Sequence, residues 1–128
     1  MGKDAGFASH AIVAFSATAQ PDAARRFYRD ALGLRLVSED SFALVFDAHG
    51  TPLRVQIVAK VVPAAYTALG WKVGDIAAAM KRLQEAGVTM QRYPSMGQDD
   101  QGVWTSPSGA KVVWFHDPDG NTLSLTEF

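Results

Sequence analysis

Histidine is the side chain best suited to proton transfer near neutral pH. The sequence has three histidines, His10, His49 and His116. None of them shows the i, i+4 spacing of a helical metal-binding pair. His116 is the candidate for a general base, because strand alternation places it on the same face as Trp114. The alternative is that His116 is structural or solvated, and the sequence leaves its catalytic role unknown.

Arg54 is the residue with the clearest capacity to bind an anion. A cation on the ligand-binding face of a sheet costs free energy unless it is paired or solvated. Arg54 therefore forms an ion pair with a residue such as Asp47 or Glu127, or else binds a carboxylate through its planar donor fork. Gln56 lies two residues further along the same strand and shares that face.

Large aromatic residues provide the apolar part of a candidate ligand site. Aromatic side chains dominate both protein cores and ligand pockets. Tyr66, Trp104 and Trp114 are the pocket candidates, and Ser124 is expected beside Trp114 and His116. Trp71 is expected to point to the same side of its strand as the alternate apolar residues around it, so we assign it to the core.

Residues 117–121 read Asp-Pro-Asp-Gly-Asn, which is first of all a turn. Asp and Asn side chains bond to local backbone N–H groups, and glycine adopts positive φ without strain. The sequence contains no Gly-x-Ser-x-Gly motif, phosphate-binding loop or dinucleotide fingerprint. The absence of cysteine excludes disulfides, thiol nucleophiles and iron–sulfur clusters.

The composition is that of one globular domain. The chain has 128 residues, of which 48% are hydrophobic and 20% charged, with a net charge of −1. A chain of this length forms a single core. The charge balance argues against a nucleic-acid partner, and the apolar runs are too short for a membrane helix. A cytoplasmic location is expected.

The chain reads as strand-helix-strand-strand-strand, twice. In the first half a helix opens at Pro21 and ends at Gly33, as a left-handed C-cap favours glycine. In the second half Asp75 caps a helix that Gly87 ends, with its apolar side expected to comprise Ile76, Met80, Leu83 and Ala86. The expected strands cover residues 10–18, 34–38, 42–47, 53–59, 67–73, 88–92, 111–116 and 122–126. An additional segment, residues 94–109, separates the second and third strands of the second half and resembles a functional lid or a surface loop.

Two motifs carry a resemblance to a known family. Residues 27–34 read Phe-Tyr-Arg-Asp-Ala-Leu-Gly-Leu, and residues 115–123 read Phe-His-Asp-Pro-Asp-Gly-Asn-Thr-Leu. Together with the repeat, they resemble the glyoxalase/bleomycin resistance/dioxygenase superfamily, also called vicinal oxygen chelate proteins. The resemblance implies an α+β fold of two βαβββ modules, about residues 8–60 and 66–128. Their strands would form a cupped eight-stranded mixed sheet, with the helices on its convex face.

The resemblance also implies where metal ligands would lie in metal-dependent relatives. These enzymes place one ligand, usually His, Glu or Gln, on the first and last strand of each module. The matching residues here are Val13, Arg54, Ala68 and Ser124. Divalent cations prefer carboxylates and imidazoles, so no metal site and no cofactor are expected.

The sequence therefore predicts a metal-free protein that binds a small molecule in the cup. A carboxylate-bearing or aromatic ligand is expected, held by Arg54, Gln56, Tyr66, Trp104, Trp114, His116 and Ser124. The resemblance implies a homodimer. One alternative is a glyoxalase-like lyase or extradiol-type dioxygenase with an atypical site. The other is a non-catalytic interaction module with a filled cup.

Overall fold

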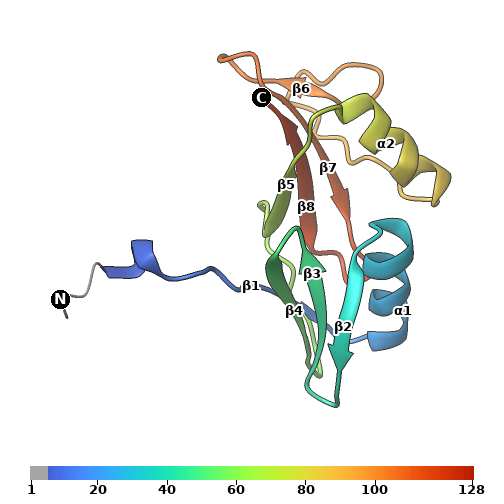
Figure 1. Cartoon of the computed structure of the whole chain (residues 1–128). Helices are drawn as coiled ribbons and strands as arrows, with labels where there is room; N and C mark the ends of the chain where they lie inside the picture. Colours follow the sequence, from blue (N-terminus) through green and yellow to red (C-terminus); the bar gives the residue numbers. More distant parts are fainter. Residues whose placement is uncertain (1–5) are drawn as a thin grey trace.

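The structure is a computed structural model that describes residues 6–128 (Figure 1). A short 3-10 turn, η1 (Gly6–Ser9), comes first. The first module comprises β1 (Ala14–Thr18), α1 (Pro21–Arg26), the π-helical turn η2 (Phe27–Ala31), β2 (Arg35–Glu39), β3 (Ala43–Ala48) and β4 (Thr51–Ile57). The second comprises β5 (Leu69–Lys72), α2 (Ile76–Glu85), β6 (Trp104–Thr105), β7 (Lys111–His116) and β8 (Thr122–Glu127).

Each module forms its own four-stranded sheet. The orders are β1-β4-β3-β2 and β5-β8-β7-β6, so both modules have the same topology. In each sheet the first strand pairs in parallel with the last, and the remaining pairs are antiparallel. The expected α+β fold of two modules is confirmed, with the eight strands divided between two sheets.

Strand alternation separates a buried face from an open one. Leu44, Phe46, Leu53 and Val55 in the first sheet are buried, as are Val113, Phe115, Leu123 and Leu125 in the second. These side chains form the core together with residues of the helices, which cover one side of both sheets (Figure 1). The opposite side is here called the open face.

The helix boundaries follow the predicted signals. Pro21 occupies the first position of α1, and Gly33 has a φ of 76° after the helix ends. The Asp75 side chain accepts a hydrogen bond from the N–H of Ala78, 3.1 Å away, and so caps α2. Ile76, Met80 and Leu83 are buried as expected. Ala86 is exposed, which corrects its assignment to the apolar side, because the helix has ended at Glu85.

The second edge of the second sheet differs from the prediction. Residues 88–92 do not form a strand, although the N–H of Gln91 donates to the Trp114 carbonyl at 2.7 Å. The chain then leaves the sheet and returns as the two-residue strand β6. The additional segment therefore interrupts the edge strand itself, instead of following a complete second strand. Short edge strands are common at the margins of native sheets, because they leave few N–H and C=O groups unpaired there.

Residues 117–121, here called the intermodule turn, fasten the two modules together. The predicted turn forms, since Asp117 Oδ1 accepts from the N–H groups of Asp119 and Asn121 at 3.0 and 2.9 Å. The same residues also reach the first module. Tyr28 donates its hydroxyl to Asp117 Oδ2 at 2.7 Å, and Asn121 Nδ2 donates to the Ala17 carbonyl at 2.9 Å.

Asp119 adds a second contact between the modules. Its carboxylate accepts a hydrogen bond from the Thr18 hydroxyl and another from the Ala19 N–H, at 2.9 Å. On the helix side, Arg82 Nε of α2 donates to the Ala31 carbonyl at 3.1 Å. A side-chain carbon at Gly33 would lie 2.6 Å from Arg82 Nη2, so glycine here also makes room for this arginine.

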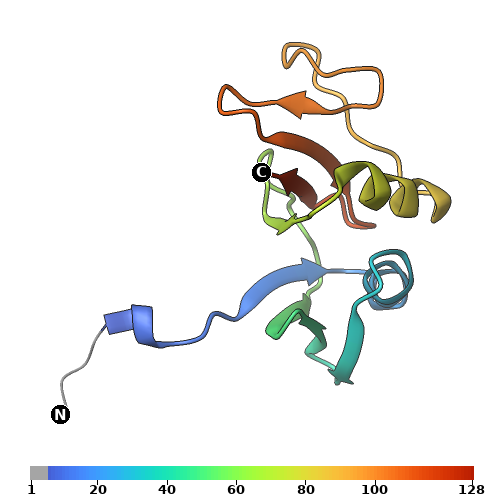
Figure 2. The same ribbon diagram turned by 45° about the horizontal axis from the view of Figure 1, so that its top comes forward.

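Residues 6–13 extend away from the two modules (Figure 2). Phe7, Ile12 and Val13 are exposed there. Among residues 6–128, no helix is long and apolar enough to cross a membrane.

The first prediction concerns the buried Tyr28 hydroxyl. Burial and the Asp117 carboxylate raise the pKa of Tyr28 well above its ordinary range, so it remains a hydrogen-bond donor. Tyr28→Phe should lower the free energy of unfolding by ~1.5–3 kcal/mol, the range for a hydrogen bond to a charged group. Urea denaturation measures this change. Tyr66→Phe, at an exposed tyrosine, is the control and should change stability little; equal effects of the two substitutions would contradict the prediction.

Candidate functional site

An aromatic pocket lies on the open face of the second module. Its volume is about 430 Å³. We call it the sheet-face pocket, and its main lining residues are Tyr66, Thr67, Tyr93, Met96, Trp114 and Thr122. A cavity of this size falls within the range of small-molecule sites.

Trp114 is fixed at the centre of this pocket. It lies opposite Ser124 in the β7–β8 pair, so both face away from the core, as predicted. Its indole Nε1 donates to Thr67 Oγ1 at 3.1 Å, and the Tyr93 ring meets it edge-on at a centroid distance of 5.6 Å. The Trp104 ring lies 6.0 Å away on its other flank. These contacts present a preformed aromatic surface to a ligand.

The side chain of Gln98 makes three of the hydrogen bonds that hold the loop forming one wall of the pocket. Gln98 Oε1 accepts from the Tyr93 N–H at 2.7 Å, while its Nε2 donates to the carbonyls of Gln91 and Gly102 at 3.0 and 2.8 Å. Reasoning from the sequence identified the additional segment but missed Tyr93 and Thr67 as lining residues. The aromatic residue before Pro94, at the start of that segment, was the available signal.

Arg54 and Gln56 lie on the open face of the first module. Arg54 sits between Phe15 of β1 and Val45 of β3, and Gln56 lies opposite Ala17. Within residues 6–128 Arg54 forms no ion pair or hydrogen bond, so the suggested pairing with Asp47 or Glu127 is wrong. Glu127 instead accepts from the Ile76 N–H at 2.9 Å, at the start of α2. Arg54 is thus a half-buried cation beside an exposed phenyl ring.

The predicted site residues fall into three groups. Tyr66 and Trp114 line the sheet-face pocket, and Trp104 and Ser124 adjoin Trp114. Arg54 and Gln56 lie on the other sheet. His116 is exposed at the end of β7 and lines a different cavity.

The residues at the four positions implied for a metal do not suit one. Val13 and Ala68 have no donor atom, Arg54 is a cation, and Ser124 offers one neutral hydroxyl beside Gly70. Divalent cations need several carboxylate or imidazole ligands. Across residues 6–128, no three His, Asp or Glu side chains gather in a group that could hold a metal ion.

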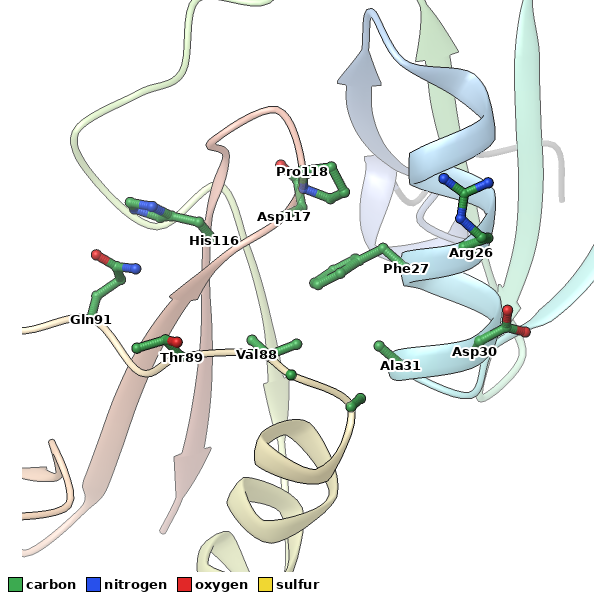
Figure 3. Close-up of a pocket in the computed structure, with 12 residues that line it drawn as sticks. Arg26, Phe27, Asp30, Ala31, Val88, Thr89, Gln91, His116, Asp117 and Pro118 are labelled. Atoms are coloured by element: carbon green, nitrogen blue, oxygen red, sulfur yellow. The ribbon is translucent and has the colours of Figure 1, made fainter.

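A larger cavity lies on the helix side, between the modules (Figure 3). Its volume is about 590 Å³, and we call it the helix-side pocket. The first module contributes Arg26, Phe27, Asp30 and Ala31, and the second contributes residues 86–89, Gln91 and 116–118. This pocket was not predicted from the sequence, since its walls come from elements that pack together only in the folded chain.

Comparison with known proteins agrees with this architecture. The structure is similar to a glyoxalase family protein from Bacillus anthracis, with a TM-score of 0.73 and 15% identity over 93% of this chain and 94% of that one. It is also similar to a lactoylglutathione lyase from Agrobacterium tumefaciens, with a TM-score of 0.71 and 19% identity over 92% and 93% of the two chains. A superfamily member from Sphaerobacter thermophilus has a TM-score of 0.69 and 25% identity over 92% and 98%.

No curated protein matches the chain. A family model matches residues 10–125 of the chain. This range includes strands of both sheets, both motifs and the intermodule turn. The chain therefore belongs to the Glyoxalase/Bleomycin resistance protein/Dioxygenase superfamily.

Proposed function

We propose that this protein binds a small molecule on its open face without using a metal. The observation that carries the proposal is the preformed aromatic surface around Trp114. Four superfamily positions that could supply metal ligands hold Val13, Arg54, Ala68 and Ser124, which supports the metal-free part of the proposal. The cysteine-free composition fits the cytoplasmic location that we also propose.

The ligand we propose carries a carboxylate on an aromatic or amphipathic body. Arg54 forms no ion pair or hydrogen bond within residues 6–128 and faces the open side of its sheet, although, after backbone hydrogen bonds, its charge contributes to lowering the pKa of the exposed Asp40. A fixed cation favours an anionic ligand group by Coulomb's law. The aromatic pocket and Arg54 lie on different modules, so a ligand that uses both requires the two open faces to approach one another, as they would in a homodimer.

A homodimer is the second part of the proposal. The open side of the first module leaves large apolar side chains in water, including Phe15, which is 53% exposed. The neighbouring segment adds Ile12, which is 75% exposed. Contiguous exposed apolar surface of this kind usually marks an interface. We propose that pairing occurs through the sheet edges next to these residues.

Two alternatives are less well supported by the geometry. A lyase needs an acid or base at the ligand, and the side chains lining the sheet-face pocket include no carboxylate or imidazole. The lactoylglutathione lyase among the similar structures shares the fold at 19% identity, which does not transfer its reaction. An interaction module with a filled cup would require the additional segment to occupy the pocket, whereas residues 93–96 form its wall.

The second prediction tests the role of Arg54. 4-Nitrobenzoate, which does not itself fluoresce, should quench tryptophan fluorescence more strongly than its neutral amide does. Arg54→Met should weaken acid binding roughly ten- to a hundredfold, the range for a charge-assisted hydrogen bond. Trp71→Phe with Trp104→Phe leaves Trp114 as the reporter. Lys81→Met, on the exposed side of α2, is the charge-matched control; unchanged binding by Arg54→Met would make Arg54 irrelevant to the ligand.

The third prediction concerns metal independence. The purified protein should contain no stoichiometric nickel, zinc, iron or manganese by elemental analysis. Its melting temperature should be the same with and without EDTA, because a metal bound only by the folded state would raise that temperature by mass action. A metal ion bound in one-to-one ratio would overturn the metal-free proposal.

The fourth prediction concerns assembly. Light scattering at micromolar concentration should give about twice the mass of the 13.8 kDa chain. Phe15→Glu should shift the protein toward the monomer, because it places a charge in the proposed apolar interface. Ala78→Glu, which adds the same charge to the exposed side of α2, should leave the mass unchanged. A monomeric parent protein would contradict the homodimer.

A further inference from the structure

We propose that the helix-side pocket is a second binding site, specific for a small carboxylate with a compact aromatic or branched apolar body. This site is separate from the open face, since its walls come from α1, η2 and the segment after α2. Its volume of about 590 Å³ exceeds that of the sheet-face pocket, and it suits a ligand of this kind.

The apolar surface of the pocket is held in place by the core. The Phe27 ring projects into the cavity between the two walls (Figure 3). It packs against Phe115 at a centroid distance of 6.3 Å and against Tyr28 at 5.2 Å. Tyr28 is in turn bonded to Asp117, so the wall that bears Phe27 is fastened to the opposite module. Val88 and Pro118 complete an apolar surface that needs little rearrangement to receive a ligand.

Arg26 supplies the available charge at this pocket. Two other charged residues line its wall: Asp117, whose oxygens accept bonds from Tyr28, Asp119 and Asn121, and Asp30, which is bonded to Arg29 at 2.8 Å. The bond to Arg29, and to a smaller extent the charge of Arg26, lowers the pKa of Asp30. Arg26 forms no ion pair or hydrogen bond through its side chain within residues 6–128. Its planar donor fork matches a carboxylate. The pocket therefore favours an anionic group at the α1 side.

The opposite side of the pocket offers further hydrogen-bonding groups. Gln91 and His116 lie across from Arg26, with Phe27 between them (Figure 3). Their side chains, and the hydroxyl of Thr89 nearby, form no hydrogen bond within the part of the chain that the structure describes. A ligand with a carboxylate at one end and a polar substituent at the other would satisfy both sides.

The test uses 4-fluorophenylacetate and its amide as probes with the full chain. Fluorine NMR measures binding, and imidazole NMR signals report the place of binding, because the chain has only three histidines. The acid should shift the His116 signal, leave those of His10 and His49 unchanged, and bind at least about tenfold more tightly than the amide.

Substitutions then distinguish this site from the open face. Arg26→Met should weaken acid binding roughly tenfold or more, and Thr89→Trp, at an exposed lining residue, should abolish it by filling the cavity. Lys81→Met and Arg54→Met should leave the His116 response intact. The proposal is overturned if the acid fails to bind at millimolar concentration, if Arg26→Met and Thr89→Trp bind as the parent does, or if Arg54→Met alone removes the response.

Discussion

The arrangement of the molecule depends on the buried carboxylate of Asp117. One of its oxygens closes the turn of residues 117–121, and the other accepts hydrogen bonds from Tyr28 and from Asn121. A buried carboxylate is tolerated only when its lone pairs are satisfied. Because Tyr28 belongs to the first module, these bonds can all form only when the modules adopt one relative position. The two motifs that identify the family, residues 27–34 and 115–123, thus meet at this carboxylate.

That fixed position of the two modules determines where the two pockets lie. The two sheets carry their buried residues toward the helices, which leaves Trp114 on the open face and Phe115 in the core. Phe115 contacts Phe27, which lines the cavity between the modules. Adjacent residues of β7 therefore point to opposite sides of the same sheet. Trp114 lines the sheet-face pocket, and Phe115 packs against Phe27, which lines the helix-side pocket.

The features that the sequence could predict are local ones. Helix ends follow from Pro21, Gly33 and Asp75, and the face of each strand follows from alternation, as Trp114 and Phe115 illustrate. The features it could not predict involve partners distant in the chain. The interruption of the edge strand by residues 93–103 is accompanied by bonds that Gln98 and Arg92 make to this segment, and whether Arg54 is paired depends on which carboxylates the fold brings close to it. Alternation places a side chain on a face, but it does not say which distant residue will meet it.

Both ligand proposals rely on an arginine, although the chain has almost no net charge. The acidic residues outnumber the basic ones by a single residue, yet several of them are occupied within the fold. Glu39 is paired with Arg25, and Asp30 with Arg29. Asp117 and Asp119 accept hydrogen bonds from residues of the first module. Arg26 and Arg54 form no ion pair within residues 6–128; Arg26 lines the helix-side pocket, whereas Arg54 lies on the open face of the first module. Structural bonds thus occupy several carboxylates, whereas Arg26 and Arg54 have no ion-pair partner in the described part of the chain, and these are the groups that we propose attract anionic ligands.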